Sequence, residues 1–289
     1  MGSPFDAIAA ARATLVRSGV ATADAAIDAE MLARAALGWD RAKLLAYGRD
    51  PSPPDFENAF EPLVRRRATR EPVALILGRR EFWGLEFEVT PDVLIPRPET
   101  ELLVEEALAF ARSHRCQLAL DVGTGSGCIA VALAHELPDL RVVAVDASRP
   151  ALAVAARNAS LNGVADRITF RHGDVLDAVT ETADLILSNP PYVAEADAAG
   201  LPPEVIRYEP HAALFGGGDG LAVMRRLVEQ APARLARDGR LIVEFGFGQE
   251  HALRNLAVEF NWDVVRIRED LQGIPRTAVL TRPPGSPVI

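Results

Sequence analysis

Apolar residues recur at helical spacing through the first 70 positions of the chain, as in Ile8, Ala11, Leu15 and then Ile27, Met31, Ala35. Each such helix would carry one apolar face, which is typical of helices that pack against each other. Thr22 suits the N-cap of the second helix, and Gly38, Gly48 and the prolines between residues 51 and 54 interrupt the pattern. The pattern predicts a small helical bundle over residues 1–72.

The pattern changes after residue 72. Between residues 85 and 89 apolar and acidic residues alternate, which is strand periodicity, and Trp83-Gly84 supplies a turn. Pro96 and Pro98 end this segment, because proline cannot continue a hydrogen-bonded ladder. We expect residues 73–98 to form a β-hairpin linker between two domains.

Strand and helix patterns alternate through residues 99–289. The expected strands are residues 118–122, 141–146, 168–172, 184–188, 240–245, 262–267 and 277–281. The expected helices are residues 99–112, 129–136, 150–162 and 221–237. Such alternation requires right-handed crossovers between parallel strands. We therefore expect an α/β domain with a seven-stranded, mostly parallel, Rossmann-like sheet that helices cover on both faces.

Composition narrows the classes of partner. The 289 residues are 49% hydrophobic and carry a formal net charge of −9, which is typical of a globular protein with a sizeable core. Binding to phosphates needs clustered Lys and Arg. The short cluster of Arg65 to Arg67 with Arg70 is more typical of a solvated helix face. A nucleic-acid partner is therefore disfavoured.

Cysteine usage and the N-terminal residues favour a cytoplasmic protein. Cys116 and Cys128 lack C-x-x-C spacing and fit reduced thiols better than a disulfide framework. The first 19 residues contain Asp6 and Arg12 and have no basic n-region, so they do not resemble a signal peptide. No apolar run approaches the roughly 18 residues of a membrane span. We expect no membrane partner.

A glycine-rich loop follows the first expected strand of the second domain, with the sequence Asp121-Val-Gly123-Thr124-Gly125-Ser126-Gly127. Glycines at a strand-to-helix junction allow a sharp turn and a close approach of the backbone to a ligand. A dinucleotide loop, G-x-G-x-x-G, would place its third glycine at Cys128. The spacing therefore opposes an NAD-dependent oxidoreductase and favours a nucleoside without pyrophosphate, as in S-adenosylmethionine enzymes.

Acidic residues end the next two strands. Asp146 lies where a carboxylate can accept hydrogen bonds from both hydroxyls of a ribose. Asp174 follows the third strand and could accept a hydrogen bond from an adenine amino group, although Gly173-Asp174 is equally compatible with an ordinary turn. Since ligands bind at the carboxyl ends of strands in open α/β sheets, we expect the glycine loop and both acids to share one site.

The fourth strand leads into Asn189-Pro190-Pro191-Tyr192. A carboxamide or aminopurine nitrogen is a poor nucleophile because its lone pair is delocalised. The Asn189 side-chain carbonyl and the Pro190 backbone carbonyl would accept its hydrogens and favour positive charge developing on nitrogen. The Tyr192 ring could lie against the planar group. This loop predicts methylation of a planar nitrogen, with Asn189, Pro190 and Tyr192 as catalytic residues.

The sequence offers no metal-ligand spacing. His114, His135, His172, His211 and His251 are scattered. We expect no metal cofactor.

Several motifs resemble the PrmC/HemK family, the protein-(glutamine-N5) methyltransferases of peptide chain release factors. The resemblance covers nearly the whole chain and rests on the stretches 71–78, 81–84, 92–101, 121–127, 188–192, 208–210 and 273–275. The segment Ile95-Pro-Arg-Pro-Glu-Thr-Glu101 is the most specific of them, because Asn-Pro-Pro-Tyr also occurs in adenine-N6 methyltransferases.

The resemblance implies an N-terminal domain that docks the release factor and a class I S-adenosylmethionine-dependent methyltransferase domain over residues 99–289. The substrate would be the glutamine of the Gly-Gly-Gln motif. Apart from the resemblance, we expect a monomeric enzyme. By position, residues 123–127 and Asp146 would bind S-adenosylmethionine, and Asn189 would contact cofactor and substrate. Pro190, Pro191 and Tyr192 would shape the glutamine pocket. Some relatives have Trp at the position of Val175, and aromatic packing on adenine from that position would be lost here. A contact of the Val175 side chain with adenine is therefore an expectation only.

Three other functions compete with this interpretation. A nucleic-acid adenine-N6 methyltransferase would use the same Asn-Pro-Pro-Tyr chemistry but would need a basic recognition region. A dinucleotide oxidoreductase does not fit the glycine spacing. A non-catalytic module that binds S-adenosylmethionine would need the glycine loop but not the complete loop from Asn189 to Tyr192.

Overall fold

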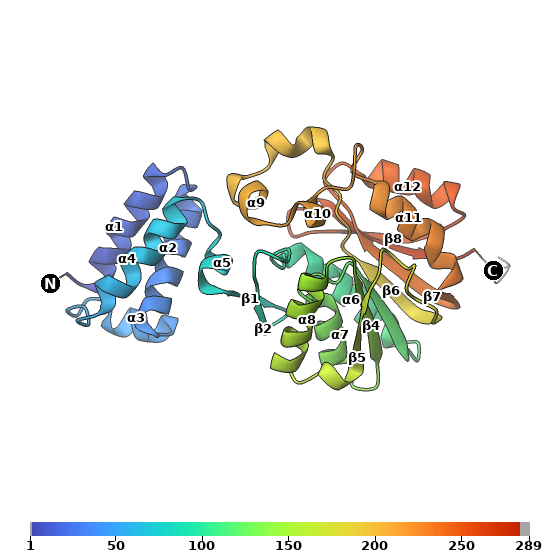
Figure 1. Cartoon of the computed structure of the whole chain (residues 1–289), viewed down its shortest axis with the longest axis horizontal. Helices are drawn as coiled ribbons and strands as arrows, with labels where there is room; N and C mark the ends of the chain where they lie inside the picture. Colours follow the sequence, from blue (N-terminus) through green and yellow to red (C-terminus); the bar gives the residue numbers. More distant parts are fainter. Residues whose placement is uncertain (1, 284–289) are drawn as a thin grey trace. The chain divides into compact units, whose positions relative to one another are not determined.

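The computed structural model describes residues 2–283. These residues form two compact units, one of residues 2–79 with 202–208 and one of residues 80–201 with 209–283. The first unit is helical (Figure 1). Its helices are α1 Pro4–Arg17, α2 Thr22–Leu37, α3 Arg41–Tyr47, α4 Phe56–Ala68, α5 Val73–Leu77 and α9 Pro203–Tyr208. The apolar faces expected from the sequence meet in one core, which contains Leu15, Leu32 and Phe60.

Helix α5 changes the expected boundary between the two domains. Residues 73–98 were expected to form a hairpin linker, but residues 73–77 are helical. Val73 and Ile76 are buried in the core of the helical unit, because two apolar residues three positions apart lie on one helix face. The unit consequently extends to Arg79.

A β-hairpin follows, formed by β1 Arg79–Phe82 and β2 Leu85–Glu88. Trp83 and Gly84 form its turn, with φ of 57° and 69°, as a two-residue hairpin turn requires. Phe82 and Phe87 are buried in the core of the second unit. The hairpin is therefore part of that unit's packing.

The second unit contains a seven-stranded sheet in the order β5-β4-β3-β6-β7-β9-β8. The strands are β3 Leu118–Val122, β4 Arg141–Asp146, β5 Ile168–His172, β6 Ala183–Ser188, β7 Leu235–Glu244, β8 Asp263–Glu269 and β9 Pro275–Thr281. Strands β3 to β7 are parallel, and β9 is antiparallel to both β7 and β8. The expected mostly parallel α/β sheet is confirmed.

Helices cover both faces of this sheet, as Figure 1 shows. The helices α6 Glu101–Ala111, α7 Cys128–Glu136 and α8 Arg149–Leu161 pack on one face, and α11 Ala222–Gln230 and α12 Glu250–Glu259 pack on the other. Successive residues of β3 separate the two cores, since Ala119 belongs to the first and Leu120 to the second. Short helical elements complete the unit: η1 Pro98–Thr100, η2 Ala165–Arg167, η3 Glu195–Gly200, α10 His211–Leu214 and η4 Ala231–Ala233.

The helix expected over residues 221–237 is shorter in the structure. Helix α11 ends at Gln230, a 3₁₀ turn follows, and β7 begins at Leu235. Pro232 has no backbone N–H and cannot continue the helical hydrogen bonds. Leu235 instead pairs with Ala183 of β6.

No helix within residues 2–283 is both long and apolar enough to cross a membrane.

Candidate active site

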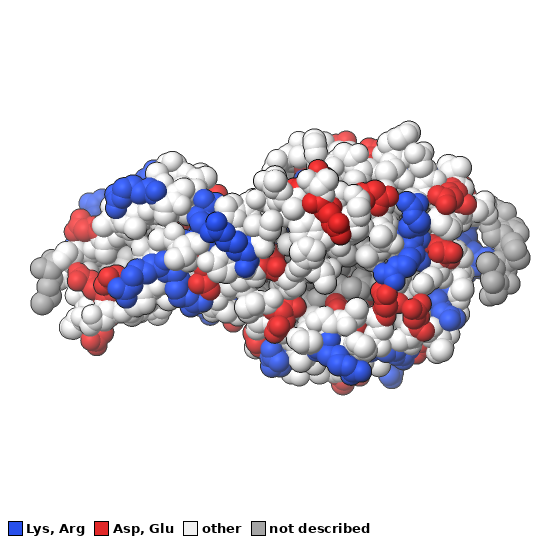
Figure 2. All heavy atoms as spheres, turned by 45° about the horizontal axis from the view of Figure 1, so that its top comes forward, with Lys and Arg blue, Asp and Glu red and all other residues white. Residues whose placement is uncertain are grey.

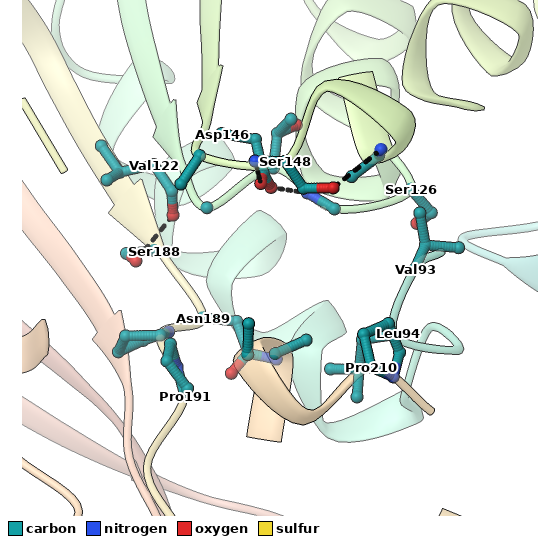
Figure 3. A pocket seen from close by; sticks show the side chains of 18 of the residues that line it. Val93, Leu94, Val122, Ser126, Asp146, Ser148, Ser188, Asn189, Pro191 and Pro210 are labelled. Atoms are coloured by element: carbon teal, nitrogen blue, oxygen red, sulfur yellow. Dashed lines mark hydrogen bonds between the residues drawn. The ribbon is translucent and has the colours of Figure 1, made fainter. Parts of the chain in front are cut away.

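The carboxyl ends of β3, β4 and β6 open on a cavity of about 320 Å³ (Figure 3). Its walls come from residues 92–94, 122–126, 146–148, 173–175 and 188–191, and residues near Pro210 close one side. This volume is within the range of small-molecule sites. The position at the strand ends is the one expected for a ligand in an open α/β sheet.

The glycine loop forms the turn between strand β3 and helix α7. Gly123, Gly125 and Gly127 have φ of 73°, 55° and 81°, a region that other residues rarely adopt. The N–H of Gly123 donates to the carbonyl of Val145 over 2.8 Å, which ties the loop to β4. A Cβ on Gly123 would meet no atom within 4 Å, so the space beside the backbone is open. The loop therefore leaves room for a ligand close to the main chain.

Gly127 differs from the other two glycines. It does not line the cavity, whereas residues 123–126 do. A Cβ at this position would lie 3.0 Å from the Cβ of Ala155 on α8. Because Gly127 has no side chain, the loop can pack closely against α8. The spacing of the glycines in the sequence could not distinguish this packing role from cofactor binding.

Asp121 holds the glycine loop in place through hydrogen bonds. Its Oδ2 accepts hydrogen bonds from the Thr124 hydroxyl, over 2.6 Å, and from the Ala130 N–H, over 3.1 Å. Within the described residues its Oδ1 has no hydrogen-bond partner. Burial raises the pKa of this carboxyl to about 7.

Asp146 closes β4 and reaches the cavity (Figure 3). Its Oδ2 accepts a hydrogen bond from the Gly125 N–H and its Oδ1 accepts one from the Ser148 N–H, both over 2.8 Å. Burial raises the pKa of this carboxyl above its ordinary value. Each carboxylate oxygen has a second lone pair, so Asp146 can still accept two hydroxyl donors.

Asp174 and Val175 also line the cavity. The Asp174 carboxylate accepts two hydrogen bonds from the Arg226 guanidinium, over 2.5 and 3.0 Å. This partner lies on α11 and was not expected from the sequence. Val175 is buried and has a φ of 52°, which is strained for a β-branched residue. The expected contacts of both residues with adenine remain predictions.

The Asn-Pro-Pro-Tyr loop leaves β6 directly at the cavity. The Ser188 hydroxyl donates to the carbonyl of Val122 over 2.7 Å and holds the end of the strand (Figure 3). Asn189, Pro190 and Pro191 line the cavity, and Tyr192 does not. The Tyr192 hydroxyl instead donates to the Glu244 carboxylate over 3.3 Å.

Glycines from a later turn pack against the backbone of this loop. A Cβ on Gly216 would lie 2.4 Å from the Pro191 carbonyl oxygen, and one on Gly220 would lie 2.3 Å from the Tyr192 carbonyl oxygen. The Gln249 side chain donates to the same Tyr192 carbonyl over 2.8 Å. The loop is therefore fixed along its length.

The Ile95–Glu101 segment contacts the site through one ion pair and three hydrogen bonds. Arg97 forms an ion pair with the buried Glu209, which also accepts the Ile95 N–H over 3.1 Å. Thr100 accepts a hydrogen bond from the Asn189 side-chain N–H₂ over 3.0 Å and donates one to Glu244 over 2.7 Å. The resemblance identified this segment as specific, and the structure supplies the physical reason.

Two polar residues of the site were missed in the sequence. Glu244 is buried at the end of β7, where an acid follows an apolar run, and that position could have been noticed as the end of a central strand. Asn158 is buried on α8, and its side-chain N–H₂ donates to the carbonyls of Ser126 and Glu88 over 2.9 and 3.0 Å. Asn158 gives no signal in the sequence, because its partners are distant along the chain.

Family comparisons match both units. Residues 6–78 match the PrmC N-terminal domain, and residues 98–219 match the Methyltransferase small domain. A release factor glutamine methyltransferase of Cereibacter sphaeroides is 46% identical over 94% of this chain and 95% of its own length. This chain belongs to the release factor glutamine methyltransferase family. A family member from Geobacter sulfurreducens is 45% identical over 92% of both chains.

Solved structures confirm the fold of the family. The catalytic domain of hMettl16, in complex with an RNA hairpin, aligns with a TM-score of 0.57 and 18% identity, over 78% of this chain and 84% of that one. A ribosomal protein L11 methylase from Lactobacillus delbrueckii subsp. bulgaricus aligns with a TM-score of 0.50 and 22% identity, over 66% of this chain and 82% of that one. Both are methyltransferases, so the α/β unit has a methyltransferase fold.

Proposed function

We propose that this enzyme transfers a methyl group from S-adenosylmethionine to the side-chain N5 of the glutamine in the Gly-Gly-Gln motif of peptide chain release factors. The observation that carries the proposal is the arrangement of Asp146 and Asn189, which lie across one cavity from each other (Figure 3). The side of the cavity with Asp146 suits a nucleoside, and the side with Asn189 suits a planar amide. The names of the similar proteins support a release factor glutamine as the substrate.

Residues 123–126 and Asp146 would hold the cofactor. The open space beside Gly123 admits a ligand against the backbone, and Asp146 has lone pairs for two ribose hydroxyls. Asp174, Val175 and Asn189 line the same cavity and would complete the contacts. When bound, S-adenosylmethionine supplies an electrophilic methyl group on a sulfonium.

Asn189 and Pro190 would orient the glutamine. The side-chain oxygen of Asn189 and the backbone carbonyl of Pro190 would each accept one N–H of the substrate amide, which favours positive charge on nitrogen as its new bond to carbon forms. Holding the two reactants in line contributes roughly 7–11 kcal/mol in well-oriented systems. The nitrogen loses its proton after transfer, so no strong base is required.

Tyr192 lies outside the walls of the cavity, and its expected contact with the substrate amide stays a prediction. Its hydroxyl donates to Glu244. Pro191, in contrast, lines the cavity. We propose that Pro191 shapes the wall of the glutamine pocket and that the bond of Tyr192 to Glu244 fixes the end of the loop.

Charge distribution disfavours the alternative of an adenine-N6 nucleic-acid methyltransferase. In the basic cluster that was expected to be a solvated helix face, Arg65, Arg66, Arg67 and Arg70 all pair with carboxylates, and Arg67 is buried. Basic and acidic side chains are interspersed over the sheet-containing unit on the face that Figure 2 shows. A phosphate backbone would need uncompensated positive charge. The helical unit would instead dock a protein, and the enzyme would work in the cytoplasm with the translation machinery.

The test is transfer of labelled methyl from S-adenosylmethionine to purified release factor, to a variant whose Gly-Gly-Gln glutamine is replaced by alanine, and to DNA and RNA. We expect label on the intact release factor alone. Label on nucleic acid, or equal label on the alanine variant, would contradict the proposal.

A further inference from the structure

A chain of hydrogen bonds runs from Asn189 through Thr100, which also lines the cavity, to the buried Glu244. The Asn189 Nδ2 donates to the Thr100 Oγ1 over 3.0 Å, and the Thr100 Oγ1 donates to a carboxylate oxygen of Glu244 over 2.7 Å. The Tyr192 hydroxyl donates to the other oxygen of Glu244 over 3.3 Å. Thr100 and Glu244 are 2% and 1% exposed. Water therefore does not compete for these bonds.

The direction of each bond follows from the chemistry of Thr100. Its hydroxyl has one proton, and an ionised Glu244 can only accept, so that proton must point to Glu244. The Thr100 oxygen can then only accept from Asn189. The amide of Asn189 must turn its N–H₂ group to Thr100, which leaves its Oδ1 for the cavity.

This direction matters for catalysis. A substrate amide presents N–H donors to Asn189, so only the Oδ1 of Asn189 can orient it. In the flipped orientation Asn189 would present donors to donors. An unconstrained carboxamide can adopt either orientation, because its oxygen and nitrogen ends are nearly the same size.

We propose that Thr100 and Glu244 are positioning residues, which form a relay that fixes the Asn189 carboxamide with its oxygen toward the substrate nitrogen. The inference rests on the proposed role of Asn189 and adds the two residues that enforce it. It also assigns a function to the threonine of the Ile95–Glu101 segment, which lies far from Asn189 in the sequence.

The charge of Glu244 controls the relay. Burial raises the pKa of Glu244 to about 7, against the hydrogen bonds from Thr100 and Tyr192, which lower it. The negative charge of Glu99 also raises the pKa of Glu244, and the positive charge of Arg276 lowers it. Arg276 and Arg97 also act on the neighbouring Tyr192. The pKa of Tyr192 is raised by its own burial, so its hydroxyl stays a donor.

Protonation of Glu244 would remove the constraint. A neutral carboxyl can donate to Thr100, whose own proton is then free to point to Asn189. Asn189 would have to turn its oxygen to Thr100 and its N–H₂ group to the cavity. We therefore expect kcat to fall as the pH decreases below about 7.

A purely structural role for Thr100 predicts different results. Thr277 supplies the matched control, because it is also fully buried, is the register partner of Glu244 on β9, and has an Oγ1 without a hydrogen-bond partner within residues 2–283. Thr277→Val removes a buried hydroxyl next to the relay and leaves the relay intact.

The experiment measures kcat and KM with release factor, the Kd of S-adenosylmethionine by calorimetry, and thermal unfolding for Thr100→Val, Thr100→Ser and Thr277→Val. We expect Thr100→Val to lower kcat by about 10- to 100-fold, by analogy with the range for residues that orient metal ligands through hydrogen bonds, with the Kd of the cofactor nearly unchanged. Thr100→Ser should restore most of kcat, and Thr277→Val should match the wild type in kcat.

Glu244→Gln provides an independent test that does not require Thr100→Val to fold. Because its amide is neutral at every pH, this variant should lose the decrease of kcat below about pH 7. A wild-type kcat in folded Thr100→Val, equal losses in Thr100→Val and Thr277→Val, or an unchanged acid limb in Glu244→Gln would each overturn the relay. Absence of transfer by the wild-type enzyme would instead contradict the proposed function.

Discussion

The Asp146 carboxylate accepts a hydrogen bond from the Gly125 N–H over 2.8 Å, so the acid that closes β4 also holds the glycine loop in place. Asp146→Ala removes both this bond and the expected acceptors for a ribose. We expect S-adenosylmethionine to bind more weakly by about 1.5–3 kcal/mol, the range for hydrogen bonds to charged groups. Isothermal titration calorimetry measures this loss.

Asp174→Ala is the comparison for Asp146→Ala. Both acids line the cavity, but Arg226 already donates to both oxygens of Asp174. The loss in affinity for S-adenosylmethionine should therefore be smaller than for Asp146→Ala. A larger loss would show that Asp174 is the main acceptor in the cofactor site.

Asn189→Ala should affect the reaction more than cofactor binding. The substitution removes the side-chain oxygen that would orient the substrate amide, and loss of one preorganised polar group costs about 10²-fold in kcat. Single-turnover rates and the Kd of S-adenosylmethionine separate the two effects. Full activity of Asn189→Ala would refute the mechanism even though the family is established.

Gly127→Ala should destabilise the fold. The new Cβ would lie 3.0 Å from the Ala155 Cβ, and φ is +81°. Gly163→Ala is the control, because its φ is +70° but a Cβ there would meet nothing within 4 Å. The left-handed backbone costs roughly 1–2 kcal/mol in both variants, so any larger loss in Gly127→Ala, measured by urea unfolding, comes from the contact with α8. Equal losses would exclude a packing role for Gly127.

In the helical unit, Glu204→Gln should reduce stability. Glu204 accepts hydrogen bonds from Arg67 and Arg70 over 3.1 and 2.6 Å, and the Arg67 side chain is only 7% exposed. We expect a loss of about 1.5–3 kcal/mol in the unfolding of this unit.

The exposed pair of Glu61 and Arg65 supplies the control for Glu204→Gln. Glu61→Gln should cost less than about 1 kcal/mol, because water screens exposed ion pairs. Hydrogen exchange resolves the helical unit from the rest of the chain. Equal losses of unfolding free energy in the two variants would show that the buried ion pairs of Glu204 stabilise the unit no more than the exposed pair of Glu61 does.

Much of this architecture could be predicted from the sequence. The strands followed from apolar runs, because a central parallel strand is buried on both faces. The end of α11 and the helix α5 were not predicted correctly, because a short apolar stretch such as residues 73–77 fits a strand or a helix until its packing partner is known.

The candidate site could be predicted only where chemistry follows a strand end. Asp146 and Asn189 were found in this way, and the cavity joins them. Glu244 and Thr100 were not identified as a pair, since 144 positions separate them in the sequence and only the fold brings their side chains within 2.7 Å. The buried partner of a functional residue leaves no local pattern.

The pKa of Glu244 also predicts the pH dependence of stability. Because burial raises it to about 7, the folded state binds the proton more tightly than the unfolded state. The resulting stabilisation is complete below the unfolded pKa and is lost as the pH rises through about 7. Glu244→Gln should therefore gain stability relative to the wild type between pH 5 and 8, as measured by urea unfolding. An unchanged difference between the two proteins over this range would contradict the shift.

The most direct test of the proposed function is tandem mass spectrometry of the release factor peptide that contains the Gly-Gly-Gln motif, after incubation with the enzyme and S-adenosylmethionine. The proposal predicts one added methyl group on the side-chain nitrogen of that glutamine, and about 10²-fold less of this product when Asn189→Ala replaces the wild-type enzyme for the same short time. A methyl group on another residue of the release factor, or an unmodified peptide beside methylated nucleic acid, would contradict it.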